Sequence, residues 1–250
     1  MGRDLAGPAA SLFGLLTLWW LLSATITLGL PTPPVVAVAF ADVLADSSFQ
    51  SSAVTSALRV YIPFVAAVML AVPIGLLAGW YDPFADLALP ALEVLRPIPP
   101  IAWIPAVILL IPGTEPGIMF ITFLGAFFPI LLNALEGGRG IDREYAKAAR
   151  SLGADTVSTF RHVGIPAALP SITTGLYVGM GLAWLNLVAA EMLAGGSGLG
   201  YHTWSAYTGG SYPHIVVGML SIAALGALST AAVGRLDRWV LPWQTGSTHL

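Results

Sequence analysis

The segment between residues 142 and 166 combines charged and apolar residues at helical spacing, and that spacing indicates a surface that binds another molecule. On a helical wheel, one face carries small or apolar side chains, those of Tyr145, Ala148, Ala149 and Leu152. The opposite face is cationic, with Arg143, Lys147 and Arg150. We expect Asp142 to be the N-cap and Gly153 the left-handed residue that ends the helix. Two interpretations stay open: docking into a groove on a partner protein, or resting on a membrane surface.

A second group of charged residues lies within an apolar, proline-rich stretch. Glu93 and Arg96 are three residues apart, a spacing at which two side chains on one helix face can pair. Four prolines follow within nine residues, at Pro97, Pro99, Pro100 and Pro105, so no continuous helix can pass through. Ionisable groups at membrane depth usually face the protein or a pathway. An ion pair that fixes the kink and a direct role along a transport path are therefore alternatives.

Catalytic and metal-binding constellations are not apparent. The chain has no cysteine, and its four histidines lack the spacing of metal ligands. A membrane enzyme would need acids, histidines or a nucleophile clustered at one depth. The basic residues follow the predicted topology and form no aromatic-interleaved surface for nucleic acid. We therefore expect no enzyme activity, no metal and no cofactor in this chain.

Composition places these groups in a membrane protein. Of the 250 residues, 56% are hydrophobic and 9% are charged, whereas a soluble domain carries about 25% charged residues. Six segments approach the ~20 apolar residues that cross a bilayer, namely residues 11–30, 54–80, 87–111, 117–135, 167–190 and 215–233. The expected fold class is all-α: one integral membrane domain, 1–250, with six transmembrane helices, since isolated strands leave backbone groups unpaired in lipid.

The basic residues predict the orientation of this domain. With the N-terminus in the cytoplasm, eight of the ten lie on the cytoplasmic side, namely Arg3, Arg139, Arg143, Lys147, Arg150, Arg161, Arg235 and Arg238. Only Arg59 and Arg96 lie elsewhere. The positive-inside rule then predicts that both termini and the loop 136–166 are cytoplasmic.

The N-terminal part of the chain carries three further expectations. The first apolar segment is interpreted as an uncleaved span, because its apolar run exceeds the 7–15 residues of a signal peptide. Residues 35–49 are expected to form a short helix on the outer membrane surface, with Asp42 and Asp46 facing water, and the second span to begin beyond Ser52. Arg59, near the outer end of that span, is expected to extend to the interface.

The C-terminal part carries three more. Residues 155–162 are expected to form a short helix, and Gly164 and Pro166 to mark a turn into the fifth span. Within that span, three glycines are expected to allow close helix packing, at Gly175, Gly179 and Gly181. The glycine-rich loop 195–200 is not interpreted as a phosphate site, because no Lys-Ser/Thr follows it.

The 142–166 loop resembles the EAA motif of binding-protein-dependent ABC importer permeases. That motif is Glu-Ala-Ala, three residues, Gly, nine residues, and Ile-x-Leu-Pro. Here Lys147-Ala-Ala149 precedes Gly153 at that spacing, and Val163-Gly-Ile-Pro166 follows at the required distance. Lys147 stands where the family usually has glutamate, and Glu144 lies one turn earlier. Residues 95–105, 125–129 and 189–193 are similar to the nitrate/sulfonate/taurine branch of that family.

The resemblance implies a type I ABC importer permease (MetI-like) fold in a prokaryotic inner membrane. Implied partners are a second permease subunit, expected to be identical, two cytosolic ATPases that hold ATP and Mg, and an extracytoplasmic substrate-binding protein. The resemblance implies coupling to the ATPase through Glu144, Tyr145, Lys147, Ala148, Ala149, Arg150, Leu152, Gly153 and Pro166. The expected pathway or gate residues are Glu93, Arg96, Pro97, Pro99, Pro100, Trp103 and Glu191.

The substrate class has two alternatives. A small anion, as in the resembling branch, would use Arg96 as the available cation. A thiamine-precursor, flavin-like or other heterocycle would use Trp103, Phe127 or Phe128 as an apolar wall. A stand-alone secondary transporter is the rival from another class, and it should carry more coupling groups inside its spans than Glu93 and Arg96.

Overall fold

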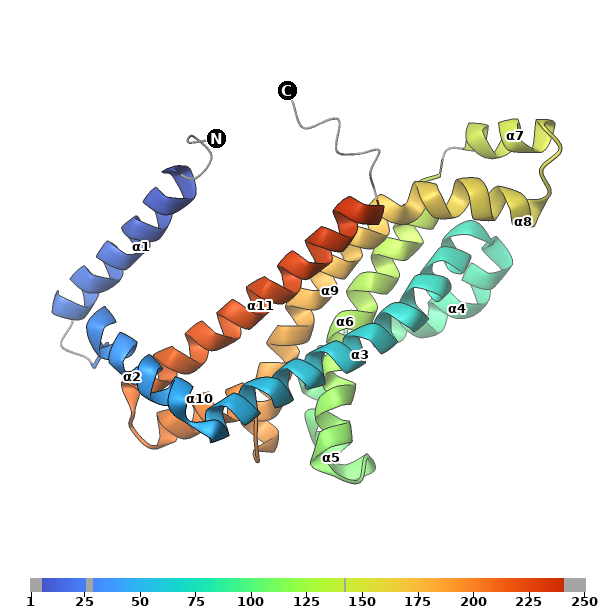
Figure 1. Ribbon diagram of the computed structural model, residues 1–250. Helices are drawn as coiled ribbons and strands as arrows, with labels where there is room; N and C mark the ends of the chain where they lie inside the picture. The colour runs from blue at the N-terminus through green and yellow to red at the C-terminus, as the bar shows by residue number, and fades with distance from the viewer. Residues whose placement is uncertain (1–5, 26–28, 142, 241–250) are drawn as a thin grey trace.

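The computed structural model describes residues 6–25, 29–141 and 143–240, and within them every regular element is helical. The elements are α1 (Ala6–Thr25), α2 (Pro33–Ala45), α3 (Ser47–Trp80), α4 (Asp82–Leu95), η1 (Pro100–Trp103), α5 (Ile104–Leu110), α6 (Thr114–Arg139), α7 (Arg143–Ser151), α8 (Thr156–Thr159), η2 (Phe160–Gly164), α9 (Ile165–Ala194), α10 (Leu199–Thr208) and α11 (Tyr212–Val240). Figure 1 shows the long helices α3, α6, α9 and α11 side by side, with α7 and α8 at one end of the bundle and α2, α5 and α10 at the other. The all-α prediction is confirmed.

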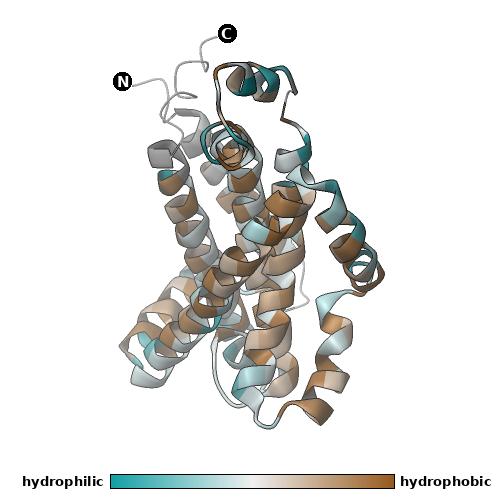
Figure 2. Ribbon diagram, turned by 90° about the vertical axis from the view of Figure 1, so that its right-hand side faces the viewer, coloured by the Kyte–Doolittle hydropathy of each residue, from teal (hydrophilic) through white to brown (hydrophobic). Residues whose placement is uncertain are grey.

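Among the described residues, four helices are long and apolar enough to cross a membrane, and they cover residues 47–80, 114–139, 156–194 and 212–236. A bent pair, 82–95 with 100–107, brings the number to five when it counts as one broken span. Apolar residues line these helices, whereas hydrophilic residues gather on the loop at one end (Figure 2). The described apolar part of α1, Phe13–Thr25, is shorter than a full span, so the count of six spans stays a prediction.

The proline-rich stretch breaks its helix, as predicted. Helix α4 ends at Leu95, the chain resumes as the 3-10 turn η1 at Pro100, and the two helical parts are bent by 78°. The physical reason is that proline has no N–H to donate and restricts the residue before it. The broken helix packs beside α6 and leaves part of the α6 surface uncovered.

Helices α3, α6 and α9 form the core, and small residues set their spacing. A Cβ on Gly75 of α3 would lie 2.7 Å from the Ala134 side chain of α6, and one on Gly175 of α9 would lie 2.7 Å from that of Asn133. Gly179 is equally close to Ile130. The prediction for Gly175 and Gly179 is confirmed, but that for Gly181 is wrong, because nothing lies within 4 Å of its Cβ position.

The second span begins earlier than predicted. Helix α2 ends at Ala45 and α3 starts at Ser47, because the Asp46 carboxylate caps it by accepting a 2.9 Å hydrogen bond from the Ser48 N–H. Three side chains of α2 are buried against α3, α10 and α11, those of Val36, Ala39 and Val43. Helix α2 is therefore part of the folded body, although Asp42 and Asp46 are exposed as expected.

The predicted turn at Gly164 and Pro166 is wrong. Asp155 caps α8 by accepting a 2.7 Å hydrogen bond from the Ser158 N–H, and α8 continues through the π-helical turn η2 into α9. The result is one helical segment over 156–194. Pro166 lies in the first turn of α9, directly after the wider π-helical turn η2. Proline is tolerated in a first turn although it has no N–H to donate, so the helical segment continues through it.

Candidate functional site

Helix α7 exposes the apolar face that the sequence predicts. Tyr145 is 66% exposed and Leu152 is 90% exposed. Ala148 is also exposed and Ala149 is partly buried, so within the described part of the chain most of this strip of small and apolar side chains is open to solvent. An uncovered apolar strip of this kind is typical of a surface that a partner buries. The predicted N-cap, Asp142, lies outside the described residues.

Gly153 ends α7 in the predicted left-handed conformation. Its φ is +90°. The Gly153 N–H donates to the Arg150 carbonyl at 3.0 Å and the Ala154 N–H donates to the Ala149 carbonyl at 3.0 Å, the two bonds of a Schellman motif. A side chain at residue 153 would meet no atom within 4 Å. Glycine is therefore required here for its backbone conformation and not for space.

The cationic face of α7 points toward the membrane helices. Lys147 and Arg150 line a cavity whose other walls come from the α3–α4 turn and the end of α6. Helix α7 lies at one end of the bundle (Figure 1), and both cations are exposed to solvent as well as lining this cavity. Glu144 is exposed on the same helix.

The loop is anchored to the bundle by an aromatic contact. The rings of Trp80, at the end of α3, and Phe160, in η2, are 5.4 Å apart. A Cβ on Gly164 would approach both rings, at 3.1–3.3 Å, so glycine permits the close approach. Val157 of α8 is 72% exposed. It extends the uncovered apolar surface beyond α7.

A cleft of about 490 Å³ runs between the broken helix, α6 and α9. Arg96, Pro99 and Pro100, three of the residues expected in the pathway or gate, lie on one wall. Phe128 of α6 and Leu185 of α9 are on the other walls, and the lining is mostly apolar. The part of the chain that the structure describes therefore offers apolar walls and one cation, Arg96, to whatever fills the cleft.

Two asparagines that the sequence analysis missed, Asn133 and Asn186, line this cleft. Asn133 Nδ2 donates to the Pro129 carbonyl at 2.9 Å, and Asn186 Nδ2 donates to the Leu182 carbonyl at 2.8 Å. These bonds leave each amide oxygen as an acceptor. A Cβ on Gly125 would lie 2.5 Å from Asn186 Nδ2, so that glycine makes room for the amide. The sequence signal that could have identified both asparagines is a polar amide side chain within an apolar span.

Glu93 and Arg96 do not pair. Both side chains are exposed, and within the described residues the ion pairs are formed by Arg59 alone. Both line a smaller cavity of about 150 Å³, but only Arg96 also lines the large cleft. The alternative in which an ion pair fixes the kink is therefore wrong, and the Arg96 charge is not neutralised by Glu93.

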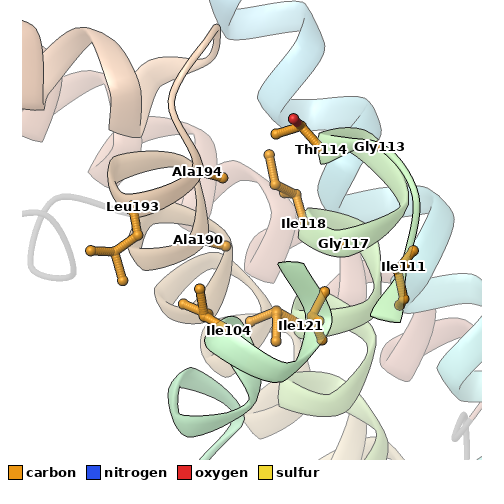
Figure 3. A pocket seen from close by; sticks show the side chains of 11 residues that line it. Ile104, Ile111, Gly113, Thr114, Gly117, Ile118, Ile121, Ala190, Leu193 and Ala194 are labelled. Atoms are coloured by element: carbon orange, nitrogen blue, oxygen red, sulfur yellow. The ribbon is translucent and has the colours of Figure 1, made fainter. Parts of the chain in front are cut away.

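Trp103 and Pro97 lie away from the large cleft. Trp103 is partly buried against the core, and Pro97 is exposed in the break between α4 and η1. Phe127 is buried in the core, so of the aromatic residues considered as an apolar wall only Phe128 lines the cleft. Next to Trp103, a separate cavity of about 250 Å³ is closed by apolar side chains such as Ile104, Ile118 and Ile121 (Figure 3). The described residues that line it include no charged group.

The structure also gathers a buried cluster around Glu191. Arg59 Nη1 donates to Glu191 Oε1 at 2.9 Å, and the same guanidinium contacts Glu115 through two hydrogen bonds. Glu191 is fully buried and Arg59 is 2% exposed. The Ser56 hydroxyl, at 2.8 Å, and the Gly200 N–H, at 2.9 Å, also donate to the Glu191 carboxylate. The expectation that Arg59 extends to the interface is wrong, because two carboxylates hold its guanidinium inside the protein.

The cluster fastens the glycine-rich loop to α3. Arg59 donates to the Ser197 carbonyl at 2.8 Å, and the Ser56 hydroxyl accepts from the Leu199 N–H at 2.9 Å. A side chain on Gly198 would collide with the Glu191 carboxylate, and Gly198 has a φ of +105°. Glu191 was predicted in the pathway or gate; it is fully buried and lines none of the cavities described above, so its role there stays a prediction. Within the described residues, no three His, Asp or Glu side chains are grouped to hold a metal.

Comparison with known proteins agrees with this arrangement. Residues 71–245 match the family described as binding-protein-dependent transport system inner membrane component. The chain is 31% identical to the nitrate import permease protein NrtB of Synechocystis sp., over 94% of this chain and 89% of the relative. It is 36% identical to a putative ABC transporter permease protein of Methanocaldococcus jannaschii, over 91% and 88%. It is 31% identical to the bicarbonate transport system permease protein CmpB of Synechococcus elongatus, over 94% and 88%.

The family match covers the broken helix, the core helices α6 and α9, and the loop that carries α7. The relatives align over nearly the whole chain, including the segment before residue 71. The chain is therefore a multi-pass inner-membrane transport component, and it belongs to the family of binding-protein-dependent ABC importer permeases.

Proposed function

We propose that this chain forms half of the translocation pathway of an ATP-driven importer and couples to a separate ATPase through residues 142–166. The observation that carries the proposal is the uncovered apolar strip on α7, with Leu152 90% exposed. Small side chains at Ala148 and Ala149 allow a groove to approach closely. The strip is the face that the EAA motif assigns to the ATPase, and it needs a partner to remove it from water.

A rigid connection supports transmission from this strip to the pathway. Helix α7 joins α8 through the Gly153 turn, and α8 is continuous with α9 over residues 156–194. Helix α9 forms one wall of the cleft that contains Arg96. A displacement of α7 by closure of two ATPases would thus move a cleft wall directly. Alternating access would be a switch between two packed arrangements of these helices.

The single domain, 1–250, with six spans and both termini in the cytoplasm is part of the same proposal. Figure 1 shows the start of α1 and the end of α11 on the same side as α7. That arrangement follows if α1 and the broken α4–α5 pair each cross the membrane. The resulting side would hold the basic residues of the loop, such as Arg139 and Arg161, as the positive-inside rule requires.

A second permease subunit, expected to be identical, would close the cleft. Its walls expose apolar side chains that no described helix covers fully, among them Val178 and Leu185, which are 46% and 57% exposed. Two such clefts face to face would enclose a pathway between them. ATP and Mg would be held by two cytosolic ATPases, and an extracytoplasmic binding protein would deliver substrate, so this chain itself needs no cofactor.

The proposed substrate is a small anion of the nitrate, sulfonate or taurine type. Arg96 lines the cleft without a carboxylate partner among the described residues, and related proteins are named for nitrate and bicarbonate. The cleft is otherwise mostly apolar, a lining that fits a thiamine-precursor, flavin-like or other heterocycle as the second candidate. The unpaired cation favours the anion.

The test is ATP hydrolysis by this chain reconstituted in nanodiscs with the candidate ATPase, with the binding protein and a panel of anions and heterocycles. Loaded binding protein should stimulate hydrolysis, and the ligand that does so identifies the substrate. Failure of the ATPase to co-purify would refute the coupling role and favour a stand-alone secondary transporter.

Residue 153 gives a sharper version of this test. Gly153→Val should uncouple hydrolysis from transport, because a β-branched residue at φ +90° is strained by about 1–3 kcal/mol. Gly153→Asn should retain coupling, since asparagine tolerates this conformation. Gly181→Val is the matched control, because its side chain also enters open space but its backbone is helical. Full coupling in Gly153→Val would contradict the assignment of the Schellman turn.

A further inference from the structure

A polar cavity of about 380 Å³ lies beneath α7, on the side opposite its uncovered apolar strip. The α3–α4 turn contributes Trp80 and Asp82, the end of α6 contributes Arg139, and α7 contributes Lys147 and Arg150. Three elements that are separate in sequence thus converge on one space. The cavity does not overlap the cleft that we assign to the pathway.

The charges around this cavity are unbalanced. Three cations, Arg139, Lys147 and Arg150, and one carboxylate, Asp82, line it, and Arg139 also lines the smaller cavity that contains Glu93 and Glu136. Within the part of the chain that the structure describes, none of the four charged side chains that line this cavity forms an ion pair, since the pairs present are those of Arg59. All three cations are also exposed to solvent, so water and salt weaken their mutual repulsion, and an anion bound between them would weaken it further.

The position of the cavity indicates where that anion comes from. Trp80 is at the end of a membrane-spanning helix, where tryptophan usually marks the boundary between lipid and water. Apolar side chains on the adjoining helices are exposed, with Leu77 of α3 at 42% and Leu87 of α4 at 79%. A headgroup in the cavity would therefore have apolar surface beside it for acyl chains.

We propose that this cavity binds the phosphate of an anionic lipid from the adjacent leaflet. Guanidinium groups match phosphate geometry with two parallel hydrogen bonds, and a lysine adds a point charge. Basic pockets between membrane helices on the cytoplasmic side are suited to such headgroups. The bound lipid would also fix the distance between α7 and the membrane helices, because Lys147 and Arg150 are on α7 and Arg139 is on α6.

The proposal is independent of the ATPase docking proposed above. It uses the cationic face of α7, whereas docking uses the apolar strip of Tyr145, Ala148 and Leu152. A chain that binds lipid normally and fails to bind an ATPase would refute only the docking. A chain that couples normally with an empty cavity would refute only the lipid site.

The experiment measures binding of phosphatidylglycerol and of phosphatidylcholine to the delipidated full chain by native mass spectrometry. The test variant is Arg139→Gln/Lys147→Gln/Arg150→Gln. The matched control is Arg161→Gln/Arg235→Gln, which removes exposed cations on the same side of the bundle but outside the cavity. Each basic residue near an anionic lipid surface contributes about a fivefold factor, so the triple variant should lose on the order of a hundredfold in phosphatidylglycerol affinity.

Four outcomes decide the proposal. Selective phosphatidylglycerol binding that the triple variant loses and the control retains would support it. Equal binding by wild type and triple variant would overturn it. A third outcome is that inorganic phosphate competes with the lipid at millimolar concentration and raises the melting temperature as much as the lipid does. The occupant would then be a free phosphate, and the lipid assignment would be overturned. If the triple variant does not fold, Asp82→Asn is tested in its place. Removal of this carboxylate should raise the affinity for phosphatidylglycerol several-fold, and an unchanged affinity would overturn the site.

Discussion

Truncation of Arg59 to alanine should be among the most damaging single changes in this protein. Glu191 would keep its hydrogen bonds from the Ser56 hydroxyl and the Gly200 N–H but lose its cation. Because Glu191 is fully buried and Arg59 is 2% exposed, the remaining carboxylate would be an uncompensated buried charge. Breaking a buried pair by removing one partner typically costs about 3–5 kcal/mol.

The ion pair with Glu115 contributes much less to the stability that is lost when Arg59 is truncated. The Glu115 side chain is 56% exposed, and pairs with an exposed partner are worth roughly 0–1 kcal/mol because water screens them. Glu115→Gln is therefore the matched control, since it also removes a carboxylate from Arg59. The large effect is assigned to the buried member of the cluster, Glu191.

The assay is the free energy of unfolding in lipid bicelles for wild type, Arg59→Ala, Glu191→Gln, the Arg59→Ala/Glu191→Gln double variant and Glu115→Gln. The double variant should be more stable than the sum of its single variants allows, because no unpaired charge remains. A loss below about 1 kcal/mol in Arg59→Ala, or strict additivity in the double variant, would refute the reasoning.

Two further predictions concern the cleft and the outer end of the bundle. Arg96→Gln should lower anion uptake into proteoliposomes by about tenfold or more, the value of a lost charge-assisted hydrogen bond. The Glu93→Gln/Arg96→Gln double variant should not restore uptake, and restoration would show that the two side chains pair after all. At the outer end, burial lowers the pKa of His202, which stacks edge-on with Phe49 and has no hydrogen-bond partner for Nε2. The unfolded chain then binds a proton at higher pH than the folded one, so stability should fall as pH drops below about 6.5. His202→Met should flatten that dependence of melting temperature, whereas the exposed His162→Gln should not.

Most of the loop could be predicted from local sequence. Helix period places Tyr145, Ala148 and Leu152 on one face, and the conformational freedom of glycine ends the helix at Gly153. Both effects act within one or two turns. The helix break between Leu95 and Pro100 is similarly local, since proline acts on its own backbone and on its predecessor. These elements appear in the structure at the predicted positions.

Predictions failed where a local signal met a distant partner. Gly164 and Pro166 indicate a turn by composition, but packing of Phe160 against Trp80 is compatible with one helix that widens into a π turn. Lys147 and Arg150 belong to a polar helix face, and only the placement of α7 against α3 and α6 decides that this face lines a cavity.

The sequence by itself determined the class of protein, because a chain with 56% hydrophobic and 9% charged residues can satisfy its backbone in lipid only as helices. It also determined the family through the spacing between Ala149, Gly153 and Pro166. Tertiary structure alone decided that Arg59 forms ion pairs with Glu115 and Glu191, and that Arg96 forms none with Glu93. The physical reason is range: helix period and turn chemistry act between near neighbours, whereas the energy of a buried charge depends on groups that only the packed helices bring within hydrogen-bond distance.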